Sequence, residues 1–139
     1  MLTVATIVRG FKNGLNITWE LGKVIIPVYI IVTILKYTPI LNWIADFMKP
    51  VMFILGLPGE ASLPLVLGMF LNIYAAIGAI LPLDMNTKEI TIVAAILLLA
   101  HSLPLEATVS KKSGAKVTSL VLARLILAFG VGIFFNFIL

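Results

Sequence analysis

The sequence has no cysteine, a single histidine and only 12% charged residues. Without cysteine the chain has neither a disulfide framework nor thiol chemistry. It also has no glycine-rich phosphate-binding loop and no paired acids at metal-ligand spacing. These absences argue against a hydrolytic or redox enzyme, so we expect no enzymatic activity and no bound metal or cofactor.

The few charges are also too scattered for a nucleic-acid interface. The net charge of +4 arises from 10 basic and 6 acidic residues. They do not form the basic clusters interleaved with aromatic residues that such an interface needs. We therefore expect no nucleic acid among the partners of this protein.

What the chain has instead is apolar sequence. Hydrophobic residues make up 61% of its 139 positions, a composition outside the range of soluble globular domains. A membrane-spanning helix needs about 20 mostly apolar residues. Four stretches approach or reach that length: residues 24–45, 61–83, 90–105 and 117–139. The sequence therefore predicts an all-α integral membrane protein.

The N-terminal segment has a different pattern. Apolar residues recur at helical spacing in residues 3–20, while Arg9, Lys12 and Glu20 lie elsewhere around the helix. This pattern is typical of an amphipathic helix that lies in the headgroup plane of a membrane. We expect residues 1–22 to form this interfacial helix and residues 23–139 to form one transmembrane domain.

A short phrase occurs twice, as LPGEASL at residues 57–63 and as LPLEATV at residues 103–109. Each copy places a glutamate within apolar sequence, where a carboxylate is costly and usually marks a solute, ion or proton pathway. Each copy also carries helix-breaking residues, Pro58 and Gly59 in the first and Pro104 in the second. The pattern predicts two interrupted helices at membrane depth, which transporters use to expose backbone polar groups to a ligand.

The distribution of Lys and Arg indicates how these breaks are placed. Basic residues concentrate near the N-terminus and in residues 110–116, whereas residues 42–50 and 84–89 contain one each. Because cytoplasmic loops are enriched in positive charge, the first two regions are predicted to be cytoplasmic and the other two external. The first phrase then forms the tip of a re-entrant helical hairpin, and the second interrupts a helix that crosses the membrane. We expect the two breaks to meet near the midplane.

Residues 41–61, LNWIADFMKPVMFILGLPGEA, resemble the small bacterial membrane proteins of the nucleoside-recognition, or Gate, family, particularly spore maturation protein B and its relatives. More distantly, residues 59–65 (GEASLPL) are similar to the hairpin-tip segment of concentrative nucleoside transporters, whose glutamate contacts the nucleoside. The resemblance implies a core of two inverted repeats, each a re-entrant hairpin followed by a broken helix and a further span.

In this resemblance the chain supplies one repeat, which is one half of an inverted-repeat transporter core. A site at a repeat interface needs two halves, so the other half would come from a second copy or from a related Gate protein. The resemblance also implies a multi-pass protein of the bacterial inner (cytoplasmic) membrane. It would move a small polar, nucleoside-like solute, with Na+ or a proton as the coupling ion.

Five polar residues are the candidate substrate-binding residues: Glu60, Ser62, Asn72, Glu106 and Thr108. Each has a structural alternative. A glutamate can cap the helix that follows it, and Glu106 can pair with Arg124 in the last span. A Ser or Thr hydroxyl can bond back to its own helix, and Asn72 can hold neighbouring helices together. His101 is expected to bond to a backbone carbonyl.

The sequence leaves two functions open. In the first, the protein is a transporter half that dimerises to place two hairpin tips around a midplane site, and it moves a solute by alternating access. In the second, it is a non-transporting membrane subunit that scaffolds or regulates another transporter, and the glutamates only cap helices.

Overall fold

The structure is a computed structural model that describes residues 3–139, and these residues form helices without any strand. In chain order the helices are α1 (Val4–Lys36), α2 (Pro39–Ile54), the short 3-10 helix η1 (Gly59–Ala61), α3 (Ser62–Phe70), α4 (Ile73–Ile80), α5 (Thr87–Ala100), α6 (Leu103–Lys112) and α7 (Val117–Ile138). Within the described residues, three helical segments are long and apolar enough to cross a membrane, and the bent pair formed by α2 and α3 would make a fourth. The prediction of an all-α membrane protein is confirmed.

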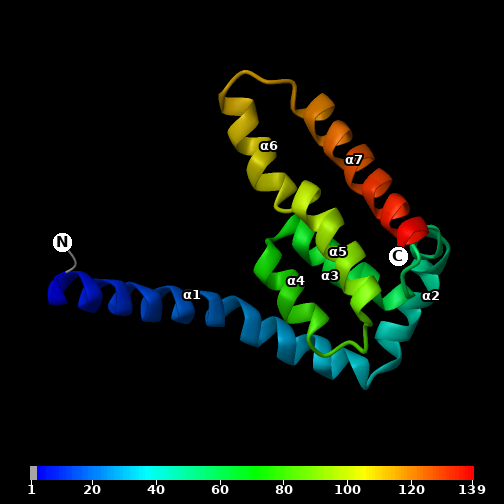
Figure 1. The fold of residues 1–139 in the computed structure, drawn as a ribbon. Coiled ribbons are helices and arrows are strands. Elements are labelled where there is room, and N and C mark those ends of the chain that lie inside the picture. Colours follow the sequence, from blue (N-terminus) through cyan, green and yellow to red (C-terminus); the bar gives the residue numbers. More distant parts are fainter. Residues whose placement is uncertain (1–2) are drawn as a thin grey trace.

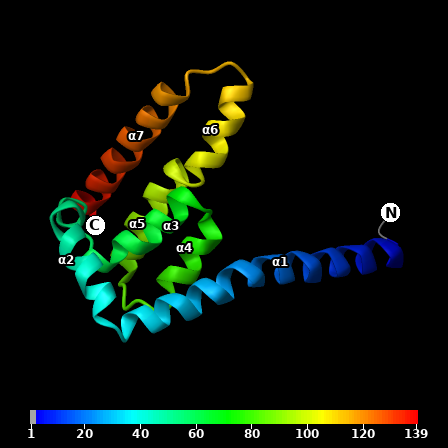
Figure 2. The same cartoon turned by 180° about the vertical axis from the view of Figure 1, so that it is seen from behind.

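Helix α5 lies at the centre of the packed part of the molecule. Its side chains Ile92, Val93 and Ile96 are fully buried, and it packs against α3 and α7. Figure 1 shows α7 running back alongside α6 and α5. Helices α3 and α4 lie between α5 and α1. Seen from behind in Figure 2, the far end of α2 lies next to the C-terminal end of α7. The main apolar core therefore joins α2, α3, α5 and α7.

The predicted span over residues 24–45 is wrong, because the chain turns in its middle. Helix α1 ends at Lys36, and α2 begins at Pro39 after an extended residue, Thr38, with φ −114° and ψ 157°. A proline restricts the residue before it to extended backbone and is favoured at the first position of a helix. Lys36 then fixes this corner, since its Nζ donates to Asp84 Oδ2 at 2.6 Å and to the carbonyl oxygen of Pro82 at 3.0 Å.

The predicted single span over residues 61–83 is also wrong. The stretch contains two short helices, α3 and α4, which pack against each other. They separate at Asn72, whose backbone is extended and whose side-chain oxygen accepts a hydrogen bond from the Ala75 N–H at 2.9 Å. Gly68 allows α3 to pack closely against both α5 and α4, because a Cβ atom there would lie 2.6 Å from Leu97 Cδ2 and 3.0 Å from the Cβ atom of Ala76. The absence of charge over this stretch therefore marks residues that avoid water and does not indicate one continuous helix.

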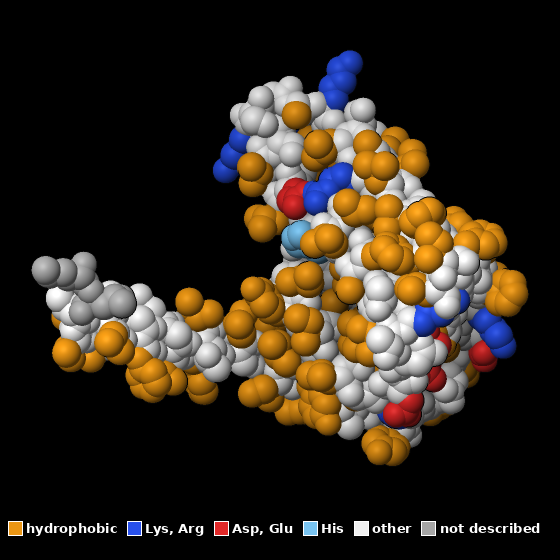
Figure 3. All heavy atoms as spheres, in the orientation of Figure 1, with side chains coloured by type: hydrophobic (Ala, Val, Ile, Leu, Met, Phe, Trp, Pro, Cys, Tyr) orange, Lys and Arg blue, Asp and Glu red, His pale blue; other side chains and the backbone are white. Residues whose placement is uncertain are grey.

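The N-terminal part of helix α1 extends from the rest of the molecule as an arm, while its C-terminal part lies alongside α4 (Figures 1 and 2). All of residues 3–20 are exposed, and the helix first becomes covered at Leu21. The helix continues without a break through residue 22, where we expected the interfacial segment to end. Hydrophobic side chains gather along one edge of this arm in Figure 3, as the amphipathic pattern predicts.

Candidate functional site

The first helix break forms because of a glycine and a proline. Gly56 follows α2 with a φ of +67°, a left-handed conformation that glycine adopts without steric cost. The Gly56 N–H donates to Phe53 O and the Leu57 N–H to Met52 O, both at 3.0 Å, which is the Schellman arrangement that ends helices. Pro58 then continues in an extended conformation. As a result, α3 leaves α2 at an angle of 92°.

Gly59 brings the chain back onto the middle of α2. A Cβ atom at this position would overlap the carbonyl oxygen of Ala45 and would lie 2.7 Å from the carbonyl carbon of Ala45. Only glycine therefore lets the backbone of η1 lie directly against the backbone of α2. This contact fixes where the next residue, Glu60, lies along the length of α2.

Glu60 opens into a surface hollow of about 400 Å³. The polar wall of this hollow is one face of α2, formed by Asn42, Asp46 and Lys49. Glu60 is half-buried, and its carboxylate has no hydrogen-bond or ion-pair partner among residues 3–139. We define these four side chains as the Glu60 hollow. Its three α2 residues were not among our candidates, although their spacing over two helical turns places them on one face of a helix.

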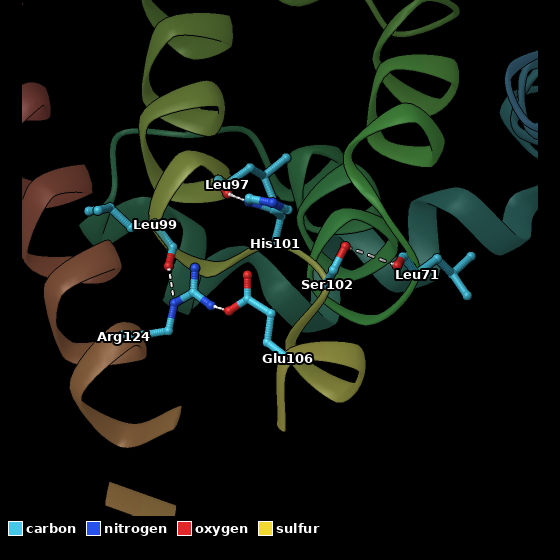
Figure 4. Close-up of polar contacts among 7 residues, drawn as sticks. All are labelled: Leu71, Leu97, Leu99, His101, Ser102, Glu106 and Arg124. Carbon is cyan, nitrogen blue, oxygen red and sulfur yellow. Dashed lines mark hydrogen bonds and ion pairs between the residues drawn. The ribbon is translucent and has the colours of Figure 1, made fainter. Parts of the chain in front are cut away.

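The second break lies between α5 and α6 and consists of His101 and Ser102. Ser102 has φ 51° and ψ 38°, a left-handed conformation that is uncommon for residues other than glycine. Two contacts hold it there, as its N–H donates to Gly68 O at 3.0 Å and its hydroxyl donates to Leu71 O at 3.3 Å. Figure 4 shows Ser102 pointing toward Leu71. The element that meets the second break is therefore the end of α3 and the turn after it, rather than the tip at Glu60.

Pro104 does not form the second break itself. It lies in the first turn of α6, where the missing N–H would have no intrahelical partner in any case. Pro58 and Gly59, by contrast, lie at the first break, where the sequence predicts them. The proline of the second phrase therefore marks where the helix resumes.

Glu106 forms an ion pair with Arg124 of α7, which is the pairing that the sequence left open. Arg124 also donates from Nε to the carbonyl oxygen of Leu99 at 2.7 Å (Figure 4).

His101 bonds to the backbone as expected, with its Nδ1 2.9 Å from the carbonyl oxygen of Leu97. In Figure 3 the histidine lies at the surface beside one acidic and one basic side chain, surrounded by hydrophobic atoms.

The remaining candidates form local bonds in the structure. The Ser62 hydroxyl is buried and donates to Gly59 O at 2.7 Å, and the exposed Thr108 hydroxyl donates to Pro104 O at 2.9 Å. Asn72 caps α4, which is a role that we did not consider for it. The five candidates thus do not line one cavity. Glu60 and Glu106, in particular, border different hollows.

Interrupted helices packed among membrane-length segments define a multi-pass membrane protein. The Gate family, described as nucleoside recognition, matches residues 18–116, and the chain belongs to this family. It is 45% identical over 119 residues to the uncharacterized membrane protein YvoD of Bacillus subtilis, covering 86% of this chain and 38% of YvoD. It is 32% identical over 72 residues to the inner membrane protein YjiG of Escherichia coli K12, covering 51% of this chain and 46% of YjiG.

The chain therefore spans less than half the length of these relatives. No solved structure matches it. The family and the named membrane relatives place the protein in the lipid bilayer of the bacterial inner membrane, in agreement with its apolar helices.

Proposed function

We propose that this protein is one half of a membrane transporter and that the Glu60 hollow is its half of a site for a small polar solute. One observation supports this above all. At a helix break of a membrane protein, the half-buried Glu60 opens into a hollow, and its carboxylate has no partner within the described part of the chain. A carboxylate in such surroundings is costly, and sites of this kind usually serve a solute, ion or proton.

The chemistry of the Glu60 hollow suits a neutral polar solute. Asn42 offers an amide, Lys49 an ammonium group, and Asp46 and Glu60 two carboxylates. These groups can donate to and accept from the hydroxyl and amide groups of a nucleoside-like molecule. The family's description as nucleoside recognition agrees with this solute class.

The hollow is open on one side, and we propose that a second repeat closes it. Trp43 and Phe47, on the same helix, are largely exposed and provide apolar surface for a second copy of this chain or for a related Gate protein. In YvoD the matching part is 38% of the protein, which leaves length for a second repeat of similar size in that relative. Alternating access around such an interface is the usual mechanism of inverted-repeat transporters.

The proposed role is transport without an enzymatic step and without a resident cofactor. Uptake would be driven by a coupling ion, either Na+ or a proton carried on Glu60. The substitution Glu60→Gln tests this mechanism, because glutamine preserves the shape of the side chain but removes its charge and its ability to exchange a proton.

Uptake by the full chain in lipid vesicles tests the proposal, with a mixture of radiolabelled nucleosides as the probe. We expect sodium- or pH-dependent uptake that Glu60→Gln abolishes. Glu20→Gln is the matched control, because Glu20 is exposed on the arm and pairs with Lys23, and it should take up solute normally. Unchanged uptake by Glu60→Gln, with the same pH and sodium dependence, would remove the carboxylate from the mechanism. No uptake by the unaltered protein, either alone or reconstituted with a related Gate protein as the second repeat, would favour the accessory-subunit role.

A further inference from the structure

Arg124 is a charged residue of the last membrane-length helix, and it touches both sides of the second helix break. We infer that Arg124 is a positioning residue that clamps the two halves of the broken helix α5–α6, with Glu106 as its counter-ion. This inference does not depend on the proposed transport function.

One guanidinium group makes both contacts. Its Nε donates to the carbonyl oxygen of Leu99, the second-last residue of α5, at 2.7 Å. Another of its nitrogens, Nη1, pairs with the carboxylate of Glu106 in the first turn of α6. The fixed fork of donors on arginine is what allows a single side chain to bond in two directions. Arg124 therefore bonds to both helices, which the backbone connects through His101 and Ser102.

The contact to Leu99 satisfies a backbone carbonyl group that the helix break leaves without an intrahelical partner. The last four carbonyl groups of a helix have no intrahelical partner, and within a membrane no water is available to satisfy them. Two of these four groups in α5 are paired with side chains, Leu97 O with His101 and Leu99 O with Arg124. The break is thus stabilised by polar side chains that a continuous helix would not require.

The charges of the pair also match the two helix ends. A helix carries partial negative charge at its C-terminal end and partial positive charge at its N-terminal end. Arg124 lies at the C-terminal end of α5, and Glu106 lies at the N-terminal end of α6. Because the pair is neutral as a whole, its side chains can be only 24% and 34% exposed within a largely apolar surface.

The surroundings of Glu106 are more apolar than those of Glu60, as expected for a carboxylate that pairs with Arg124. The hollow beside the ion pair is lined mainly by the aliphatic side chains of Leu105, Val109 and Leu120. The Glu60 hollow instead has three polar side chains from α2, none of which pairs with its carboxylate. Within residues 3–139, the repeated phrase therefore supplies one carboxylate that is paired with a cationic side chain and one that is not.

Distances between spin labels can test the clamp directly, because the chain has no cysteine of its own. Ala94→Cys with Val109→Cys places one label on each side of the break, at exposed positions of α5 and α6. Leu122→Cys with Phe134→Cys is the matched control, since both exposed positions lie on the continuous helix α7. Both pairs are measured in the full chain in lipid nanodiscs. We expect each pair to give one narrow distance distribution.

Adding Arg124→Gln should broaden the distribution across the break and leave the α7 pair narrow. The charge exchange of Glu106→Arg with Arg124→Glu should broaden it as well, because a carboxylate at position 124 cannot donate to Leu99 O and both charges then oppose the helix ends. A narrow break distance in Arg124→Gln would overturn the inference. So would full recovery in the charge exchange, since a simple ion pair would then be sufficient.

A second variant keeps the test valid if Arg124→Gln disturbs α7 itself. Arg124→Lys preserves the positive charge but replaces the forked donors by a point charge. The clamp predicts that this variant also broadens the break distance while the α7 pair stays narrow. An unchanged break distance in Arg124→Lys would show that charge alone holds the two halves, and the clamp would be rejected.

Discussion

At the scale of single residues, two glutamates in nearly identical phrases have different neighbours. The sequence predicts both breaks and both carboxylates, and it identifies Arg124 as one possible partner of Glu106. It cannot show which carboxylate is paired, because Arg124 comes from α7 and reaches Glu106 only through the packing of α7 against α5 and α6. The α2 wall of the Glu60 hollow could have been found from helical spacing alone.

The Gly59 contact gives a prediction at this scale. Gly59→Ala should destabilise the protein by about 1–3 kcal/mol, since the added methyl group overlaps the backbone of Ala45 and the two elements must separate. The measurement is thermal unfolding in detergent. Gly130→Ala is the control, because no atom lies within 4 Å of its Cβ position and alanine favours a helix by up to about 1 kcal/mol. Equal stability of the two variants would show that η1 does not lie against α2.

At the level of helices, the sequence predicts apolar character better than it predicts where each helix ends. Residues 117–139 were predicted as a span, and α7 agrees with that prediction. Residues 61–83 have the same uniform hydropathy but fold into two helices, because Asn72 can cap a new helix and Gly68 lets α3 and α4 pack closely. Hydropathy reports which residues avoid water. It does not report whether the helix between them is continuous.

The cap at Asn72 predicts the effect of its removal. Asn72→Ala should lower the free energy of unfolding by about 1 kcal/mol, because the Ala75 N–H loses its acceptor. Asn72→Ser keeps an oxygen that can accept this bond, so it should retain most of the stability. Thermal unfolding of both variants, beside Asn16→Ala on the exposed arm, provides the measurement. If alanine and serine behave alike at position 72, the cap does not stabilise the α3–α4 turn.

Across the molecule as a whole, the exposed residues 4–20 of α1 and the Glu60 hollow are not covered by any other part of the described chain. Helix α1 has 33 residues and is therefore about 50 Å long, whereas the hydrocarbon layer is about 30 Å thick. About 20 Å of it must lie outside that layer or along its surface, so the interfacial role of residues 1–22 stays a prediction. The sequence does not identify the second repeat that we propose, since one chain would display only one of the two surfaces of that interface.

A density map of the full chain in lipid nanodiscs is the decisive measurement for the Glu60 site. We expect Glu60 at the depth of the hydrocarbon layer, with its carboxylate facing a water-filled cavity that a second repeat closes over α2. A map that places Glu60 among the headgroups, or that turns its hollow toward lipid with no second repeat across it, would rule out the proposed transport site.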